Sequence, residues 1–523
     1  MSWKIFKKEI SSLDFNDETK FILGIDMGTK STKIAFWNVN RKLPELIDMS
    51  GGYGSPSIPT VIQYIPENKE WVYGEYAFFN KGYFNDITIY NILSKLGTKE
   101  LIDINGKPIN IPSILSRYIK EIIEMCKNIN PNGEVVGIVV AIPDYFSDAA
   151  KEELKRAFFM AGLDKALITF MSYRECILRY LYFEKNLIEE EKVLYVDYGG
   201  EEIRGGLIKI KPQNESNFKG ENLSFLFNKT LGLNNIDKLL KELFINFYCE
   251  ETKILKDNIT EDILNQIETF VYQNKNLLFQ NYYKKNPTKL YFNFAYPAFQ
   301  KIISIEDMNK LISPFKKEIK KFINNLLDKT IYGPISKKEV NKVIVAGGGF
   351  EMNWVKELFE KEFEGIEVIY PKQTEGIISL GACIGAASYL GIIKEKEIHL
   401  IDKQKLNIDI GIKAIFKKEN SFIPLIEKNT FWWEIPKPKI FILNLKENNI
   451  LEIPLYKRND KGDLKEIHTI TLKNLPHRPS RTIRLKFLIN FKNYNTIEAT
   501  ISDCGFGEIF PSSGFSEKFV IPV

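Results

Sequence analysis

Apolar residues are arranged along the chain in two patterns. Short continuous apolar runs, typical of buried strands, end on Asp, Gly or Pro in four places: FILGIDMG (21–28), VVGIVVAIP (135–143), VLYVDYGG (193–200) and KVIVAGGG (342–349). The first and third are followed by another β-type run, as in strand pairs joined by a glycine turn. The fourth precedes WVKELFEKEF (354–363), whose apolar residues are spaced as in a helix. This mixture predicts an α/β domain.

A change of pattern late in the chain predicts a second domain. Residues 234–330 mostly carry apolar residues three and four apart, as in amphipathic helices. The C-terminal part instead has short alternating apolar runs separated by turn clusters such as NDKGD, which is typical of an all-β domain. We therefore expect an N-terminal arm at 1–20, an α/β domain at 21–393, a charged linker at 394–405 and a β domain at 406–523.

Composition limits the classes of function. A chain of 523 residues that is 44% apolar can bury more than one core. Its 72 basic and 67 acidic residues are too balanced to predict a nucleic-acid partner. Five scattered cysteines without a CxxC pair indicate neither a disulfide framework nor a zinc site. No apolar run is long enough for a membrane span, and the N-terminal MSWKIFKKEI lacks the continuous apolar core of a signal peptide, so we expect a cytoplasmic protein.

The glycine turns carry the groups that a nucleotide needs. Backbone N–H groups in tight glycine turns suit phosphates, and magnesium prefers oxygen ligands and keeps most of its waters. The sequence supplies this set twice at strand ends: Asp26, Gly28 and Thr29, then Asp197, Gly199 and Gly200. A third turn, at Gly347 and Gly348, opens a helix and could abut a base or ribose. No GxxxxGK[ST] motif occurs, which excludes a P-loop.

Any single turn of this kind also suits a plain hairpin, but the three in this order are more specific. They resemble the actin-like ATPase superfamily, and within it the seventy-kilodalton heat-shock chaperones. GIDMGTKST looks like the first phosphate loop, VDYGG like the second, and VAGGGFEMNWVKEL like the adenosine motif. SFIPLIEKNTFWWEIP is similar to the strand and loop of the peptide groove. The resemblance covers 21–523 and indicates a divergent member that lacks the helical lid.

The resemblance implies an actin-like two-lobed ATPase domain followed by a C-terminal β-sandwich. The expected cofactors are ATP or ADP with Mg²⁺, and the expected partners are extended peptide or a protein, together with co-chaperones. Asp26 and Asp197 would hold the hydrated magnesium, and Glu175 is the nearest match to the assisting acid. Phe422 and Leu451 would lie near the peptide groove. The implied nucleotide-binding residues are Gly28, Thr29, Lys30, Gly199, Gly200, Lys275, Gly347 and Gly348.

The residues implied in hydrolysis depart from the family pattern. The second phosphate loop continues with acids and Arg204 in place of glycine, threonine and an acid. A carboxylate at Glu202 would repel a γ-phosphate unless a cation such as Lys30 compensated it. The nearest match to the catalytic lysine, Lys95, is two residues out of register. Because a small displacement of such groups can cost about 10²-fold in rate, we expect ATP hydrolysis to be slow or absent.

The sequence therefore predicts a chaperone-like protein that binds ATP with magnesium and grips extended apolar peptide or a partner. The alternative is a non-hydrolysing scaffold, in which a relict ATPase fold accompanies a β domain that binds one fixed protein. A filament-forming protein or a sugar kinase of the same superfamily is disfavoured, because neither needs a C-terminal β domain after a linker.

Overall fold

The computed structural model describes residues 20–522, with gaps. The gaps are residues 53, 81–86, 130, 145, 184–188, 214–216, 373, 394–396, 403–405, 407, 417–418, 429, 435, 444–449, 460–461, 476–477, 480 and 494–495. The expected N-terminal arm thus lies, except for Lys20, outside the described residues. The chain divides into two compact units. The first comprises Met1–Gly220, Leu226–Ile323 and Lys337–Leu400, and the second Glu221–Phe225, Asn324–Ser336 and Ile401–Val523.

Residues of the first unit form most of two six-stranded sheets. The first sheet has the order β11-β10-β1-β2-β3, with β4 paired to β2; β10 runs parallel to β1 and β2 antiparallel. Its strands are β1 (Lys20–Met27), β2 (Ser31–Asn38), β3 (Leu43–Leu46), β4 (Ser57–Pro59), β10 (Glu134–Ile142) and β11 (Leu167–Ser172). The continuous apolar runs at 21–28 and 135–143 thus form its central strands, as predicted.

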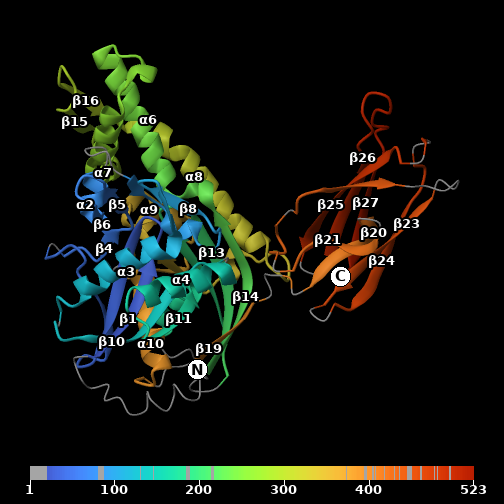
Figure 1. The fold of residues 1–523 in the computed structure, drawn as a ribbon, viewed down its shortest axis with the longest axis horizontal. Coiled ribbons are helices and arrows are strands. Elements are labelled where there is room, and N and C mark those ends of the chain that lie inside the picture. The colour runs from blue at the N-terminus through green and yellow to red at the C-terminus, as the bar shows by residue number, and fades with distance from the viewer. Residues whose placement is uncertain are drawn as a thin grey trace. The chain divides into compact units, whose positions relative to one another are not determined.

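Helices cover both faces of this sheet. They are α3 (Ile111–Cys126), α4 (Asp148–Met160), α5 (Tyr173–Tyr182) and α10 (Ile377–Tyr389). Helices α3 and α4 lie in front of β1 and β10 in Figure 1 and share a core with the alternate residues Leu23 and Ile25. Asn110, Ser147 and Ser172 cap three of these helices by accepting a hydrogen bond from a backbone N–H of the first turn.

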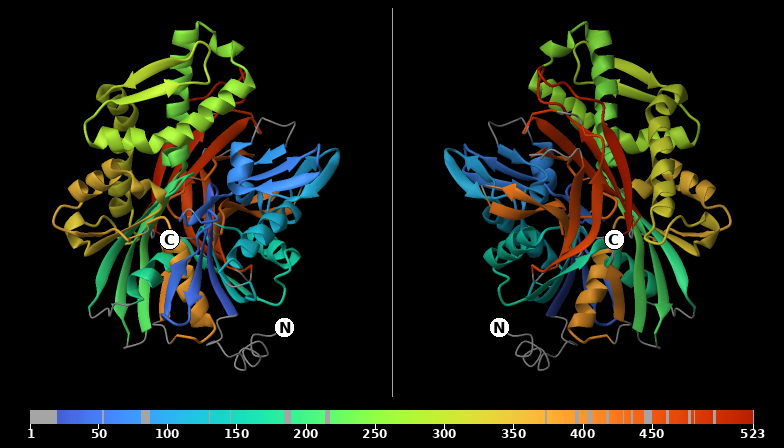
Figure 2. Two further views of the ribbon diagram at one scale, coloured as in Figure 1. Left: turned by 90° about the vertical axis from the view of Figure 1, so that its left-hand side faces the viewer. Right: turned by 90° about the vertical axis from the view of Figure 1, so that its right-hand side faces the viewer.

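Helix α10 packs unusually closely on the opposite face. Figure 2 shows this orange helix beside the blue strands of the first sheet. A Cβ atom at Gly24 would lie 2.1 Å from the Cys383 nitrogen, and one at Gly381 would lie 1.9 Å from the Cys176 carbonyl oxygen. Only glycine permits these approaches. Since side chains alternate along a strand, Asp26 projects from the same face as Gly24.

The second sheet has the order β18-β17-β12-β13-β14-β19. Its strands are β12 (Glu191–Tyr198), β13 (Ile203–Pro212), β14 (Asn217–Asn228), β17 (Lys342–Ala346), β18 (Glu367–Ile369) and β19 (Glu397–Asp402). β17 runs parallel and β13 antiparallel to β12. The apolar runs at 193–200 and 342–349 thus form neighbouring strands. β19 falls within 394–405, the range expected to be a linker.

Helices predominate between 233 and 328, as the sequence predicts. They are α6 (Leu233–Thr252), α7 (Glu261–Tyr283) and α8 (Ile305–Asp328), and a hairpin of β15 (Thr288–Phe292) and β16 (Phe299–Ile303) lies between the last two. Helix α9 (Asn353–Glu362) follows β17. The remaining described elements of this unit are β5 (Ile62–Ile65), β6 (Glu70–Tyr73), α2 (Gly74–Phe79), β7 (Ile87–Ile89), β8 (Leu101–Ile104), β9 (Lys107–Asn110) and five short 3₁₀ helices.

The second unit contains two four-stranded antiparallel sheets, with the orders β21-β20-β23-β24 and β22-β25-β26-β27. Their strands are β20 (Asp409–Phe416), β21 (Glu419–Ile426), β22 (Lys439–Leu443), β23 (Leu451–Arg458), β24 (Leu464–Leu472), β25 (Ile483–Asn493), β26 (Thr496–Asp503) and β27 (Ser516–Pro522). Buried residues alternate along β26, from Ile497 to Ile501. The predicted alternating strands are confirmed. None of the helices in the described part of the chain combines the length and apolarity that a membrane crossing requires.

Candidate functional site

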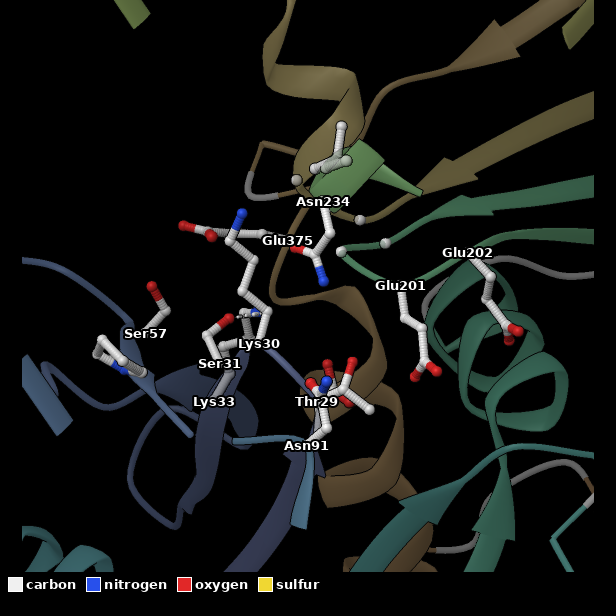
Figure 3. A pocket seen from close by; sticks show the side chains of 18 of the residues that line it. Thr29, Lys30, Ser31, Lys33, Ser57, Asn91, Glu201, Glu202, Asn234 and Glu375 are labelled. Carbon is white, nitrogen blue, oxygen red and sulfur yellow. Dashed lines mark hydrogen bonds between the residues drawn. The ribbon is translucent and has the colours of Figure 1, made fainter. Parts of the chain in front are cut away.

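A cavity of about 1150 Å³ in the first unit is lined by residues of both six-stranded sheets and of helices α6 and α7. All three glycine turns reach it. The predicted nucleotide-binding residues that line the cavity are Gly28, Thr29, Lys30, Gly199, Gly200, Lys275, Gly347 and Gly348. Figure 3 shows Thr29 and Lys30 on one side of the pocket, with Glu201 and Glu202 on the other.

The first turn joins β1 to β2 by a tight four-residue connection. Met27 pairs with Thr32 across the two strands, which leaves Gly28 to Ser31 between them. The Gly28 N–H donates a hydrogen bond of 3.1 Å to the Ser31 carbonyl oxygen. A Cβ at Gly28 would lie 2.8 Å from the same oxygen, so the close turn favours glycine.

The second turn has the same length and the same hydrogen bond. Tyr198 pairs with Ile203, and the Gly199 N–H donates to the Glu202 carbonyl oxygen at 2.9 Å. The carbonyl oxygens of Gly199 and Gly200 accept hydrogen bonds from the first N–H groups at the start of α6. This contact fixes the second turn against the helix whose residues line the cavity.

The third turn packs against the end of β12. Gly347 has a φ of 90°, and a Cβ there would lie 2.5 Å from both the Asp197 Oδ1 and the Tyr198 carbonyl oxygen. A side chain at this position would therefore collide with the second turn as well as strain the backbone. The glycine places the β17 turn directly beside Asp197.

Asp26 and Asp197 come together in this cavity. Both are buried, with 6% and 2% of their surface exposed. Burial raises the pKa of Asp26 to about 6; the positive charge of Lys33 opposes this rise, and the negative charge of Asp197 adds to it. Asp26, on β1 of the first sheet, and Asp197, on β12 of the second, both line this cavity from the ends of their strands.

Each of these aspartates faces a basic residue on the neighbouring strand. Asp26 pairs in register with Lys33, and Asp197 pairs with Arg204. The Arg204 Nε lies 2.7 Å from Asp197 Oδ2, and its Nη1 lies 3.4 Å from Glu202 Oε1. The guanidinium group also lies 4.1 Å above the ring of Tyr173. Arg204 is therefore held by two acids and an aromatic face.

A second charge cluster crosses the cavity. Lys30 Nζ, from the first turn, donates to Asp237 Oδ2 on α6 at 2.5 Å, and Lys275 Nζ on α7 lies 3.2 Å from the same oxygen. Burial alone would raise the pKa of Asp237, but the two lysines together lower it. Burial and the neighbouring Lys30 charge lower the pKa of Lys275 to about 8, against the attraction of Asp237.

The two aspartates do not fit a hydrated magnesium ion in the way the resemblance implies. The Arg204 side chain already forms a salt bridge with the Asp197 carboxylate. A magnesium ion instead needs carboxylate oxygens that are free to bind it, or room for its water molecules. No group of three or more His, Cys, Asp or Glu side chains among the described residues is placed to hold a metal ion. The expected role of Asp26 and Asp197 as metal ligands is therefore at odds with the geometry.

Glu175, expected as the assisting acid, is not among the described residues that line the cavity. It lies in the first turn of α5, and its Oε1 is 3.0 Å from Arg179 Nη2. Lys95, the nearest match to the catalytic lysine, lies 2.5 Å from Glu100 and is likewise outside the cavity lining. Tyr173 reaches the cavity from the start of the same helix α5.

Phe422 and Leu451, which the resemblance places near the peptide groove, lie on opposite faces of one sheet. Phe422 pairs with Lys413, on the face where Arg458 lies 4.5 Å above the phenyl ring. Leu451 pairs with Leu472, which is fully buried. Because side chains alternate along β23, Leu451 belongs to the core face of the sheet.

Sequence reasoning named Arg204 only as a departure from the family loop and missed its pairing with Asp197; it missed Lys33 and Asp237 altogether. A pattern for the cations exists in the sequence: a basic residue follows each aspartate by seven positions, at Lys33 and at Arg204. In a hairpin with a four-residue connection, this spacing places the two side chains opposite one another. Asp237 had no comparable pattern, because its contact depends on how α6 packs against the first turn.

Comparisons with known proteins support a distant relationship. Residues 43–244 match the model of a family of unknown function (DUF5716), C-terminal part, and residues 405–523 match a domain of unknown function (DUF8552). The chain is 23% identical to chaperone protein DnaK of Thermotoga petrophila over 94% of this chain and 80% of that protein. The corresponding protein of Thermosipho melanesiensis is 22% identical over the same shares, and that of Mycoplasma mobile is 23% identical over 92% and 76%. The chain is thus a distant homologue of the DnaK chaperones along most of its length.

Proposed function

We propose that this protein is a chaperone-like nucleotide-binding protein. The two six-stranded sheets correspond to the two lobes of an actin-like ATPase domain, and the cavity takes ATP or ADP. The observation that carries the proposal is the convergence of three glycine turns, from separate parts of the chain, on one cavity of about 1150 Å³. Such turns let a phosphate approach the backbone closely, and the distant homology to DnaK agrees with this function.

Hydrolysis in this site is slow or lost. Glu175 and Lys95 are paired with Arg179 and Glu100 and lie outside the cavity lining. At the second turn, Glu202 stands where the first turn has Ser31, and its carboxylate would repel a terminal phosphate. The chain therefore retains a place for a nucleotide without the positioned acid and cation that the reaction needs.

The second unit is the proposed peptide-binding β-sandwich. β21 lies at the edge of its sheet in the described order, so its outer backbone groups suit an added extended strand. Phe422 lies on this strand and is half-buried, whereas Leu451 packs inward. We propose Phe422 as a contact for an extended apolar peptide or a protein partner, with co-chaperones acting on the nucleotide domain.

Thermal unfolding tests the nucleotide site. ATP or ADP with magnesium should raise the melting temperature, because a ligand that binds only the folded state stabilises it. Thr29→Val should reduce this rise, while Thr98→Val, which lies outside the cavity, should leave it unchanged. Phosphate release should stay at the level of a blank. A melting temperature that neither nucleotide changes would contradict the proposed function.

Peptide binding is tested separately in the second unit. Phe422→Asp should weaken the binding of a fluorescent apolar peptide and leave the nucleotide response intact. Phe506→Asp is a matched control, since this ring also lies beneath an arginine, 5.5 Å from Arg484, but is not on the edge strand. Equal loss in both variants would count against a specific role of β21.

The scaffold without nucleotide is the second candidate. The ion pair between Lys30 and Asp237 joins the first turn directly to α6. A protein held in this way needs no nucleotide to bring its two sheets together. The absence of any thermal response, with peptide or partner binding retained, would favour this candidate.

A further inference from the structure

The two glycine turns share an arrangement of charge as well as of backbone. In each, the cross-strand pair next to the one that closes the turn joins an aspartate to a basic residue: Asp26 faces Lys33, and Asp197 faces Arg204. All four residues line the same cavity. The pairing arises independently in two sheets, since β1 and β2 belong to the first and β12 and β13 to the second.

The charges match those of a divalent site. Two carboxylates and one divalent cation sum to zero, and so do two carboxylates, one lysine and one arginine. Arg204 makes the stronger contact, 2.7 Å from Asp197, and Lys33 Nζ donates to Ser31 Oγ at 2.9 Å within the first turn. These four side chains therefore carry the same net charge as two carboxylates with a divalent cation, and the buried Glu202 adds one negative charge beside Arg204.

The Arg204 guanidinium group is fixed against Asp197, one of the two carboxylates expected to hold a metal ion. Its side chain is 12% exposed, and it contacts Asp197, Glu202 and the face of Tyr173. Expelling it in favour of a divalent cation would leave Arg204 without these partners in a largely buried position, which is unfavourable. Arginine also cannot lose its charge under ordinary conditions.

We infer that Lys33 and Arg204 replace the divalent cation, so that this cavity binds its phosphate ligand without a metal ion. The identity of the ligand as an adenine nucleotide rests on the proposed function; the replacement of the cation rests on the geometry of the two turns. Arg204 acts here as a binding residue for the phosphates and as the partner of Asp197 and Glu202.

Two measurements on the unaltered chain test the inference. Calorimetric titration with ADP should give affinities that agree within about twofold in excess magnesium and in EDTA, since no metal mediates the contact. Titration with Mn²⁺ alone, followed by electron paramagnetic resonance, should show no bound ion at about the 1 mM concentrations where a weak carboxylate site fills. ADP binding that EDTA abolishes, or an Mn²⁺ site that Asp197→Asn removes, would overturn the inference.

A double variant supplies the converse test. Lys33→Gln with Arg204→Gln leaves Asp26, Asp197 and Glu202 without these two cations, so the double variant should gain an Mn²⁺ signal and a melting temperature that rises with Mg²⁺. ADP affinity in EDTA should fall by about tenfold or more, because a buried cation partner has been removed. Arg41→Gln, which removes an exposed arginine paired with Glu45, should change none of these. A folded double variant that gains no Mn²⁺ site would overturn the inference. If the double variant does not fold, the ADP and Mn²⁺ titrations of the unaltered chain decide.

The outcomes separate this inference from the proposed function. No ADP binding under either condition, together with a gained Mn²⁺ site in the double variant, would refute the nucleotide and support the replaced cation. Magnesium-dependent ADP binding by the unaltered chain would support the nucleotide as the ligand and refute the replacement of the cation.

Discussion

The two glycine turns of the cavity have nearly the same backbone and opposite side chains. Both are four-residue connections closed by a hydrogen bond from the first residue to the fourth. The first places Lys30 and Ser31 in its last two positions, and the second places Glu201 and Glu202 there. Glycine and strand pairing thus set the shape of the turns, while the remaining side chains set the charge that a ligand meets.

This difference determines how each turn is held. Lys30 of the first turn reaches Asp237 on α6 at 2.5 Å. Glu202 of the second turn stays buried beside Arg204, and Glu201 lies 3.7 Å from the exposed Lys229. The first turn therefore contributes a cation that crosses the cavity, whereas the second depends on an arginine within its own hairpin.

The largest effect should follow from removing that arginine. Arg204→Gln leaves Asp197 and Glu202 buried without their cation, which should cost about 3–5 kcal/mol of unfolding free energy. Lys33→Gln, its counterpart, should cost less, because the Lys33 ammonium group donates a hydrogen bond to the Ser31 hydroxyl within the same turn. Urea denaturation of both variants measures the difference. Equal losses would show that the two hairpins rely on their cations alike.

Asp26→Asn should stabilise the protein at neutral pH. The folded-state pKa of Asp26, raised to about 6 mainly by burial, exceeds its ordinary value of 3.8. Between these values the folded chain holds a proton that the unfolded chain has released, so stability falls as pH rises from about 4 to about 6 and stays lower above that range. The amide removes this cost of about 3 kcal/mol.

Melting temperatures measured from pH 4 to pH 7 check this expectation. Asp26→Asn should flatten the pH dependence and raise the melting temperature most at pH 7. Asp262→Asn is the control, since its side chain is exposed at the start of α7. A lower melting temperature of Asp26→Asn at pH 7 would mean that the ionised carboxylate stabilises the fold.

Much of the cavity was predictable because it depends on the chain's local patterns. Apolar runs that end on Asp and glycine gave the central strands and the three turns, and the strand ends bring these together. Whether Asp26 and Asp197 can bind a metal ion could not be predicted from these runs. It depends on the residues paired with them across each hairpin, Lys33 and Arg204. Two other contacts also lay beyond any local pattern: Glu175 pairs with Arg179 one helical turn away, and Phe422 and Leu451 lie on opposite faces of their sheet.

The two turns should also differ in their tolerance of a methyl group. A Cβ at Gly28 would lie 2.8 Å from the Ser31 carbonyl oxygen, whereas one at Gly199 would lie 3.5 Å from its nearest neighbour, the Glu202 carbonyl oxygen. Gly28→Ala should therefore cost about 1–2 kcal/mol, and Gly199→Ala should stay within about 0.5 kcal/mol. Paired denaturation curves measure this, and a greater loss at Gly199 would show that the second turn is the tighter one.

The smallest effects concern the charged side chains of the turns. Lys30→Gln removes a part-buried ion pair to Asp237, but Lys275 still contacts this carboxylate, so the loss should be about 1 kcal/mol. Glu201→Gln should change stability by less than about 0.5 kcal/mol, because its partner Lys229 is more than half exposed. High ionic strength should also distinguish the two variants. It screens the exposed pair of Glu201 with Lys229, whereas the pair of Lys30 with Asp237 across the cavity is less accessible to ions. Urea denaturation at low and high salt measures both, and a Lys30→Gln loss that disappears in salt would show that the first turn is not clamped to α6.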